Sequence, residues 1–560
     1  MNRNAESHFA LAPSTMDIGR TMFDQSFNHT FTGNFGAVLP FFCKECLPGD
    51  TFNITTSKVI RLQTLLKPIF GNMWLDCYYF FVPNRLIWEH WVNFCGESTD
   101  AWTPDVEYTV PQIVIPDGGF KFGSVADYLG VPPGVAEGAK ISALPFRCYN
   151  KIIDDWFRNQ NLEDAVNVYI GDADTDANDD PDNFVNGGNP YIAGKYHDLF
   201  TSGLPGPLKL NTPVTVPVQT STGGLIPVRT SHEDFTSNYQ HSLDPVRFWY
   251  SGQSTSEPSL NMMARLGEAT GTGNAFKLNL GGTFGPSTVQ FPHIQFANLG
   301  VNLNSINPSI SVADLRMSFQ VQKFYESLAR AGSRYTELLS SLWKVNNPDS
   351  RLQRSEYLGG NRMPIAVSQV TNNTQTENTP LGNVGAMSLT NDRHHDVVFS
   401  CSEFGYVVGV CVARYEHSYP QGLPKHFSRK DKFDFYWPVF ANISEQPIYK
   451  KELFFDGSAE DDKVFAYQEP WAHYRYGFNT VSSEMRPNHP TSLATWNLSD
   501  DYAEHPSLSY DWAKEDKTNV DRTLSVTSEV SDQILMDFYI DCRATRPMPL
   551  YSIPGLVDHH

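Results

Sequence analysis

The chain has 560 residues, of which 40% are hydrophobic and 13% aromatic, and its formal net charge is −20. This acidic excess excludes a protein that condenses nucleic acid through its overall charge, because phosphate binding needs clustered Lys and Arg. The N-terminus lacks the apolar stretch of a secretory signal, and no stretch reaches the roughly 18 apolar residues that span a bilayer. We therefore expect a soluble protein that folds in a reducing cytoplasm.

The N-terminal part contains an arm followed by strands. Residues 1–35 mix Asn, Ser, Thr and Phe without a sustained period, which predicts an arm. Strand signals begin at 38–42 and continue over 51–64 and 72–82, the last an aromatic-rich run. Pro83 ends that run, because proline cannot donate to a strand ladder.

The middle of the chain contains a helix, a loop and a long weakly charged tract. Pro145 and the apolar spacing after it predict a helix over 145–165, and 171–190 is typical of a loop. The tract 209–308 contains only ten charged residues and is dominated by Gly, Pro, Ser, Thr and Asn. Because a structureless loop of this length is uncommon in a compact domain, we predict a folded surface insertion of short strands and turns.

The next segment, 311–345, has apolar residues at helical spacing. Ser311 is a candidate helix cap with Asp314 three residues later. Gly332 predicts a break or bend, and Asn347–Pro348 predicts the end of the pattern.

Strand signals return in the last third of the chain, at 402–416, 432–440, 464–478 and 533–543. In the last of these, QILMDFYIDCR, every second residue from Ile534 onward is apolar. A chain that starts and ends in core strands is expected to close a sheet on itself, end against beginning. The sequence thus predicts a mainly β fold with long inserted loops and a few helices.

Motifs of catalysis are missing from the sequence, which contains no G-x-S-x-G, no H-E-x-x-H and no Walker motif. Cys43 and Cys46 form a lone C-x-x-C without the second ligand pair of a zinc site, so buried or turn thiols are favoured. His394 and His395, flanked by acidic residues, suggest a metal or acid–base cluster. Adjacent strand residues point to opposite faces, so a surface turn is favoured instead.

The acidic loop offers a weak calcium-binding hypothesis. Asp172, Asp174 and Asp176 have the alternate spacing with which a calcium loop begins. The sixth position is Ala177 rather than Gly and the twelfth is Asn183 rather than Glu, so a solvated acidic loop is the competing interpretation. We assign no catalytic residue, no other cofactor or metal, and no nucleic-acid-binding residue.

Two aromatic runs, 433–437 and 471–476, suggest either stacking on bases or sugars, or a core or interface role. Binding of single-stranded nucleic acid would need interleaved cations, and Lys430, Lys432 and Arg475 supply only some of them. A core or interface role is therefore favoured.

Six long stretches stand out beyond these patterns: 29–54, KYHDLFTSGLPGPLKL at 195–210, ARAGSRYTELLSSLW at 329–343, KFDFYWPVFANISEQPI at 432–448, YRYGFNTVSSEMRP at 474–487 and PLYSIPGLVDHH at 549–560. In this order they resemble the major capsid proteins of the Microviridae, in the gokushovirus branch. The resemblance spans nearly the whole chain.

The resemblance implies an eight-stranded jelly roll that assembles into a T=1 icosahedral shell around circular single-stranded DNA, with no enzymatic activity. It divides the chain into an arm (1–35), the first part of the jelly roll (36–208), an insertion (209–308) and the helix with the remaining strands (309–560). The insertion occupies the position of a threefold protrusion that meets the host.

The resemblance also implies partners and a location. The partners are further copies of the chain, a small basic DNA-binding phage protein, pilot or minor capsid and scaffolding proteins, and a receptor on the bacterial surface. The location is the virion, after assembly in the host cytoplasm. DNA contacts are expected from scattered Arg, aromatic and amide groups on the inner face.

The alternative is a secreted or lectin-like β-sandwich that binds or cleaves glycans. Glycoside cleavage needs two carboxylates a few ångströms apart, and 62 acidic residues leave room for such a pair. The missing signal peptide argues against this alternative. Assembly of closed shells would favour the capsid hypothesis, and hydrolysis of a polysaccharide would favour the alternative.

Overall fold

The computed structural model describes residues 19–97, 107–209, 312–332, 334–376 and 380–551, together with eight short strands between residues 219 and 309. The chain forms two compact units. Unit 1 comprises Met1–Asn211 and Tyr325–His560, and unit 2 comprises Thr212–Phe324.

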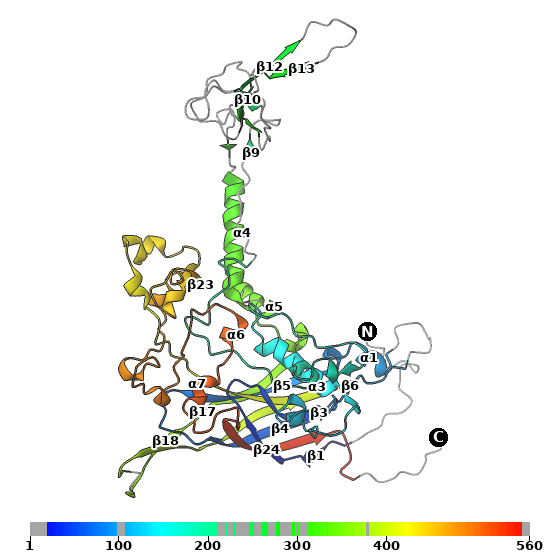
Figure 1. The fold of residues 1–560 in the computed structure, drawn as a ribbon. Helices are drawn as coiled ribbons and strands as arrows, with labels where there is room; N and C mark the ends of the chain where they lie inside the picture. Colours follow the sequence, from blue (N-terminus) through cyan, green and yellow to red (C-terminus); the bar gives the residue numbers. More distant parts are fainter. Residues whose placement is uncertain are drawn as a thin grey trace, which may run out of the picture. The chain divides into compact units, whose positions relative to one another are not determined.

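The first sheet of unit 1 joins the two ends of the chain. Strand β24 (Ile534–Arg546) pairs on one side with β1 (Thr21–Asp24) and β2 (Phe27–Gly33), and on the other with β4 (Thr51–Leu62), which pairs with β20 (Thr390–Ser400). All these pairs are antiparallel. Figure 1 shows β1 and β4, in blue, beside β24, in red. The prediction that the end of the chain pairs with its beginning is confirmed.

The second sheet has the order β17 (Glu356–Pro364), β5 (Met73–Pro83), β21 (Gly405–Tyr415) and β3 (Leu39–Cys46). If the short β1 is set aside, each of the two sheets has four strands. Most strands that are neighbours in a sheet are far apart in sequence. This is the strand arrangement of a jelly roll. The predicted fold class is confirmed: the chain is mainly β, with several antiparallel sheets and few helices.

The main core lies between the two sheets. In β24, the alternate residues Ile534, Met536 and Phe538 are buried, as the sequence pattern predicts. The Phe538 ring lies 5.1 Å from the rings of both Phe31 and Phe41, centroid to centroid, so it contacts strands of both sheets. Edge-on aromatic contacts of this kind favour a well-defined core.

Helices cover the other face of the second sheet. Helix α3 (Leu144–Ile152) continues as a π-helical turn over Ile153–Phe157 and packs its apolar side against β5 and β21. The helix predicted over 145–165 therefore exists but ends early. The helical segment ends at Phe157, and two residues later the Asn159 side chain accepts a hydrogen bond from the backbone N–H of Asn161, which favours a turn.

Two predicted strands are wrong in whole or in part. Residues 432–440 form two 3₁₀ turns, Lys432–Asp434 and Pro438–Phe440, instead of a strand. The Asp434 carboxylate accepts hydrogen bonds from the backbone N–H groups of Lys430 and Asp431, which stabilises a turn. In 464–478 only β23 (Val464–Gln468) is a strand, and it pairs with β22 (Gln446–Tyr449).

Other segments form strands where the sequence predicts none. His394 and His395 lie in β20, not in a surface turn. Residues 21–33, within the predicted arm, form β1 and β2, because Phe27 and Phe31 face the core while Asn28 and Thr30 between them are exposed. Two of the inward positions of β2 are His29 and Gly33, which are not apolar, so a hydrophobicity pattern does not reveal this alternation.

The long helix predicted after the insertion is present. Helix α4 (Val312–Ala331) ends before Gly332, whose φ of 93° favours glycine, and α5 (Tyr335–Leu338) follows with a π-helical turn over Leu339–Trp343. The predicted break at Gly332 is confirmed, and Ser311 lies outside the described residues. No helix in the described part of the chain is both long and apolar enough to cross a bilayer.

The described part of unit 2 consists of short strands. They are β9 (Gln219–Thr220), β10 (Val228–Thr230), β11 (Val246–Tyr250), β12 (Leu260–Leu266), β13 (Phe276–Leu280), β14 (Ile294–Phe296), β15 (Leu299–Val301) and β16 (Pro308–Ser309). Four of them form one antiparallel sheet in the order β13-β12-β11-β14. The tract thus contains the short strands that its composition predicts.

Candidate functional site

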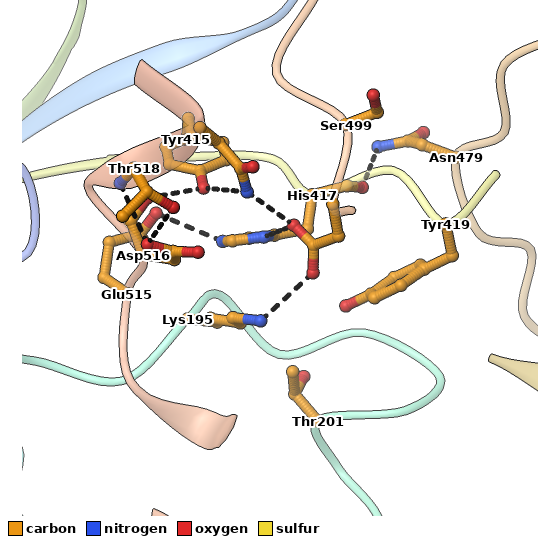
Figure 2. Close-up of polar contacts among 12 residues, drawn as sticks. Lys195, Thr201, Tyr415, His417, Tyr419, Asn479, Ser499, Glu515, Asp516 and Thr518 are labelled. Atoms are coloured by element: carbon orange, nitrogen blue, oxygen red, sulfur yellow. Dashed lines mark hydrogen bonds and ion pairs between the residues drawn. The ribbon is translucent and has the colours of Figure 1, made fainter. Parts of the chain in front are cut away.

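The most concentrated polar site of unit 1 is a buried cluster around His417, just after β21. Its ring nitrogens lie 2.6 Å from an oxygen of Asp500 and 3.1 Å from an oxygen of Glu515. The second Asp500 oxygen lies 3.1 Å from Lys195 Nζ. Figure 2 shows the side chains of Lys195, His417 and Glu515 converging from three separate segments. We name these four residues the His417 cluster.

Burial and charge together set the ionisation of the His417 cluster. Burial by itself lowers the pKa of His417, but Asp500 and then Glu515 outweigh it and raise this pKa to about 9. Burial would raise the pKa of Asp500, yet His417 and Lys195 hold it well below its usual range. Burial raises the pKa of Glu515. His417 is therefore a cation at neutral pH, with Asp500 as its charged partner.

Further hydrogen bonds complete the surroundings of Asp500. Tyr502 donates its hydroxyl at 2.7 Å, and Asn519 donates its amide at 2.9 Å. Asn519 also donates to the hydroxyl of Tyr415, which is itself buried. These contacts attach the loop around residue 500 and the segment 513–519 to the end of β21.

A histidine between two carboxylates also occurs in acid–base catalysis, but here no substrate can reach it. The side chains of the cluster are at most 4% exposed. General acid–base chemistry requires contact with the group that exchanges the proton. The arrangement therefore acts as a structural ion cluster that joins distant loops.

The cluster predicts a loss of stability at alkaline pH. The folded pKa of His417, about 9, exceeds its ordinary value of 6.5, so its contribution of about 3 kcal/mol is complete below pH 6.5 and disappears as the pH rises through 9. The raised pKa of Glu515 acts in the same direction, and the lowered pKa of Asp500 adds a separate loss in acid. Urea unfolding of the subunit from pH 2 to 10 measures this profile. A stability that stays flat between pH 7 and 10 would contradict it.

A second ion cluster lies beside a cavity of about 920 Å³. The buried Asp76 carboxylate lies 2.6 Å from Arg362 and 2.6 Å from Arg414, and it accepts a hydrogen bond from Tyr196 at 2.8 Å. Both guanidinium groups stack over the Tyr196 ring, at 4.5 and 4.3 Å. Arg362 and Arg414, which line this cavity, are thus paired with partners within the chain.

The structure does not bring the three predicted calcium ligands to one point. Asp172 lies 2.8 Å from His90 and accepts from the Trp88 indole. Asp174 lies 2.8 Å from Lys140, and Asp176 accepts from the backbone of Asn178. Calcium binding by this loop stays a prediction, and the ion would have to displace these partners.

Two groups in the described part of the chain have ligand atoms close enough for a metal ion, and of their residues only Asp172 was among the predicted metal ligands. One is Glu89, His90 and Asp172, and the other is Asp456, Asp461 and His505. His505 Nε2 lies 2.8 Å from Asp461 and 3.6 Å from Asp456. The histidine is distant in sequence from both carboxylates, so no local spacing could reveal the group.

Cys43 and Cys46 lie in β3, and His394 and His395 lie in β20. Cys46 is buried, as predicted, whereas Cys43 is half-buried, although its surroundings raise the pKa of its thiol to about 12. His394 contacts Asp396 at 2.8 Å and His395 contacts Thr55 at 3.0 Å. The two histidines therefore serve separate partners, as their strand positions predict.

The outer face of the first sheet is exposed and mixes polar side chains with apolar ones such as Val398 and Leu535. One row across four strands aligns Asn28, Tyr539, Ser57 and Arg393. The charged residues of this face are three Arg and three Asp, namely Arg61, Arg393, Arg543, Asp24, Asp537 and Asp541. The face is thus neutral on balance, in contrast to the acidic chain as a whole. We name it the open face.

A jelly-roll core with long insertions is an architecture that shell-forming proteins use. Comparison with known proteins agrees. The chain is 36% identical over 534 residues to the capsid protein VP1 of Spiroplasma virus 4, with 93% of each chain covered. It is 34% identical to the capsid protein VP1 of Chlamydia phage 1, covering 98% of each, and 34% identical to that of Bdellovibrio phage phiMH2K, covering 99% of this chain and 98% of the relative.

Residues 13–556 match the family described as capsid protein (F protein), and the chain belongs to this family of phage capsid proteins. The resemblance to the gokushovirus branch of the Microviridae is confirmed. The protein is a structural component of the virion of a small single-stranded DNA phage, where it forms a multimeric shell around the genome, and it is not an enzyme.

Proposed function

We propose that this chain is the major subunit of a T=1 icosahedral shell that assembles in the bacterial cytoplasm. The observation that carries the proposal is the jelly-roll core, whose last strand pairs with its first, in a chain that matches capsid proteins over residues 13–556. Assembly is proposed to involve scaffolding proteins, pilot or minor capsid proteins, and a small basic DNA-binding protein. The last of these would supply the positive charge that a subunit of net charge −20 lacks.

We further propose that the open face lies toward the genome. Its Arg, Tyr, Asn and Ser side chains are the types that contact phosphates and bases. Its opposite counterpart, the outer face of the second sheet, is covered by α3 and is not available. Because this face has no net charge, it repels DNA less than the acidic remainder of the chain but does not attract the phosphates either. Its contacts with DNA are therefore weak and depend on the basic partner protein.

The insertion is proposed to recognise the host. The tract 209–308 has few charges, and most of it belongs to unit 2, so its surface can change without disturbing the jelly-roll core. Loops that vary on a rigid scaffold commonly carry recognition. The tract is proposed to form protrusions at the threefold axes.

Negative-stain electron microscopy of the expressed protein, with and without its neighbouring phage proteins, tests these proposals. Uniform small icosahedral particles are expected, and only monomers or small oligomers under both conditions would contradict shell formation.

Deletion of 209–308 is expected to reduce infectivity far more than particle yield. Loss of the soluble subunit on deletion would instead make the tract part of the assembly core. Tight binding of single-stranded DNA by empty shells at physiological salt would contradict the weak open-face contacts.

A further inference from the structure

An exposed aromatic surface lies on the irregular segments 425–440 and 471–476. Eight large apolar side chains there are between 45% and 88% exposed: Phe427, Phe433, Phe435, Tyr436, Trp437, Val439, Tyr474 and Tyr476. We name this set the aromatic surface. Such residues are normally buried, so their concentration needs a physical reason.

Contacts between rings, and between rings and a cation, join part of the aromatic surface. The Tyr436 ring lies 5.6 Å from that of Trp471 and 6.2 Å from that of Tyr474. The Arg429 guanidinium lies 4.8 Å from the Phe435 ring and 4.9 Å from the Tyr474 ring, which joins the two segments.

The backbone beneath the aromatic surface is also fixed. The Trp437 indole donates to the backbone carbonyl of Lys432 at 2.8 Å, and the Trp471 indole donates to that of Phe440 at 2.8 Å. The rings are therefore presented in a defined arrangement before any partner binds. Preorganised aromatic residues lose little conformational entropy on binding.

The size of the aromatic surface matches a protein interface. If a fully exposed large side chain offers about 200 Å², the eight residues together expose on the order of 900 Å². The largest apolar patch of a typical monomer is about 300–600 Å², and a stable interface needs roughly 800 Å² from each partner. The aromatic surface alone approaches the area that one interface requires.

Charge and chemistry indicate a second copy of the chain as the partner. Residues 425–440 contain four Lys and Arg against two Asp, in a chain whose net charge is −20, so they are complementary to the acidic surface of another copy. The aromatic surface is less suited to stacking on DNA bases. Arg429 and Lys432 already lie over the rings of Phe435 and Phe433. Val439, the most exposed member, has no ring on which a base could stack.

We propose that the aromatic surface is a contact between neighbouring copies of this chain in the assembled shell. The inference rests on the proposed shell assembly and adds the residues that join the subunits. Phe433, Trp437 and Val439 become buried against the neighbour, and the cations at the edge of the surface face its acidic groups.

Two matched pairs of variants test the inference in the full chain, expressed with its neighbouring phage proteins. Val439→Asp is compared with Val530→Asp, at a valine that is 80% exposed elsewhere in unit 1, and Phe433→Glu with Phe122→Glu, at a phenylalanine that is 83% exposed. Val439→Asp and Phe433→Glu are expected to reduce the yield of sedimenting particles at least tenfold. All four variants should keep the melting temperature of the unassembled subunit within about 2 °C of the parent, because exposed substitutions cost little.

A second measurement does not depend on variants. Hydrogen exchange of residues 432–440 and 471–476 is expected to be at least tenfold slower in particles than in dissociated parental subunits. Equal exchange in both states, or equal particle yields within both matched pairs, would overturn the inference. Normal particles of Val439→Asp with less packaged DNA would overturn it in favour of a DNA contact. Failure of the parent itself to form particles would overturn the proposed shell function, and this inference with it.

Discussion

Replacing His417 by alanine is expected to lower the free energy of unfolding of unit 1 by about 3–5 kcal/mol at pH 7. The change removes the cation between Asp500 and Glu515 and leaves their buried carboxylates with Lys195 as the remaining charged partner of the cluster. An ionised carboxylate without a nearby counter-charge is costly in a site that water cannot reach. Urea unfolding followed by tryptophan fluorescence measures the loss.

The matched control is His395→Ala, at an exposed histidine of β20 whose contact is the hydroxyl of Thr55. This control is expected to change the free energy of unfolding by less than about 1 kcal/mol. His417→Ala should also remove most of the stability loss between pH 7 and 10. Equal effects of the two substitutions, or an unchanged alkaline loss in His417→Ala, would show that the cluster does not stabilise the fold.

Replacing Phe538 by alanine is expected to cost about 3–5 kcal/mol. Phe538 is fully buried in β24, and its ring contacts Phe31 of β2 and Phe41 of β3. Removing the ring leaves a cavity between the two sheets at the place where the chain's end meets its beginning. Phe538→Leu, which keeps most of the volume, should cost less than the alanine substitution.

Tyr539→Ala is the matched control, because Tyr539 is the next residue of the same strand and is 49% exposed on the open face. It is expected to cost less than about 1 kcal/mol. The urea midpoint of the purified subunit separates the two outcomes, and particle yield should fall with Phe538→Ala alone. If both substitutions cost the same, the core between the sheets would not depend on Phe538.

The sequence by itself determined much of the fold. Alternation in 533–543, the apolar run of 72–82 and the helical spacing after residue 311 each predicted an element that is present. These signals are local, because a side chain that faces a core must repeat with the period of its own strand or helix. The long family motifs likewise identified a capsid protein, since they survive as stretches of sequence.

The tertiary structure decided the features that join distant residues. Lys195, His417, Asp500 and Glu515 share no spacing, and only the packing of their loops brings them within ion-pair distance. The polar strands at 21–33 depend on pairing with β24, which no local pattern encodes. The run 432–440 has the composition of a strand, yet the hydrogen bonds of Asp434 and the ring of Pro438 favour turns and leave its aromatic residues exposed. Whether such residues are buried depends on a binding partner as well as on the chain itself, and the sequence does not show this. The structure was therefore needed to identify the aromatic surface.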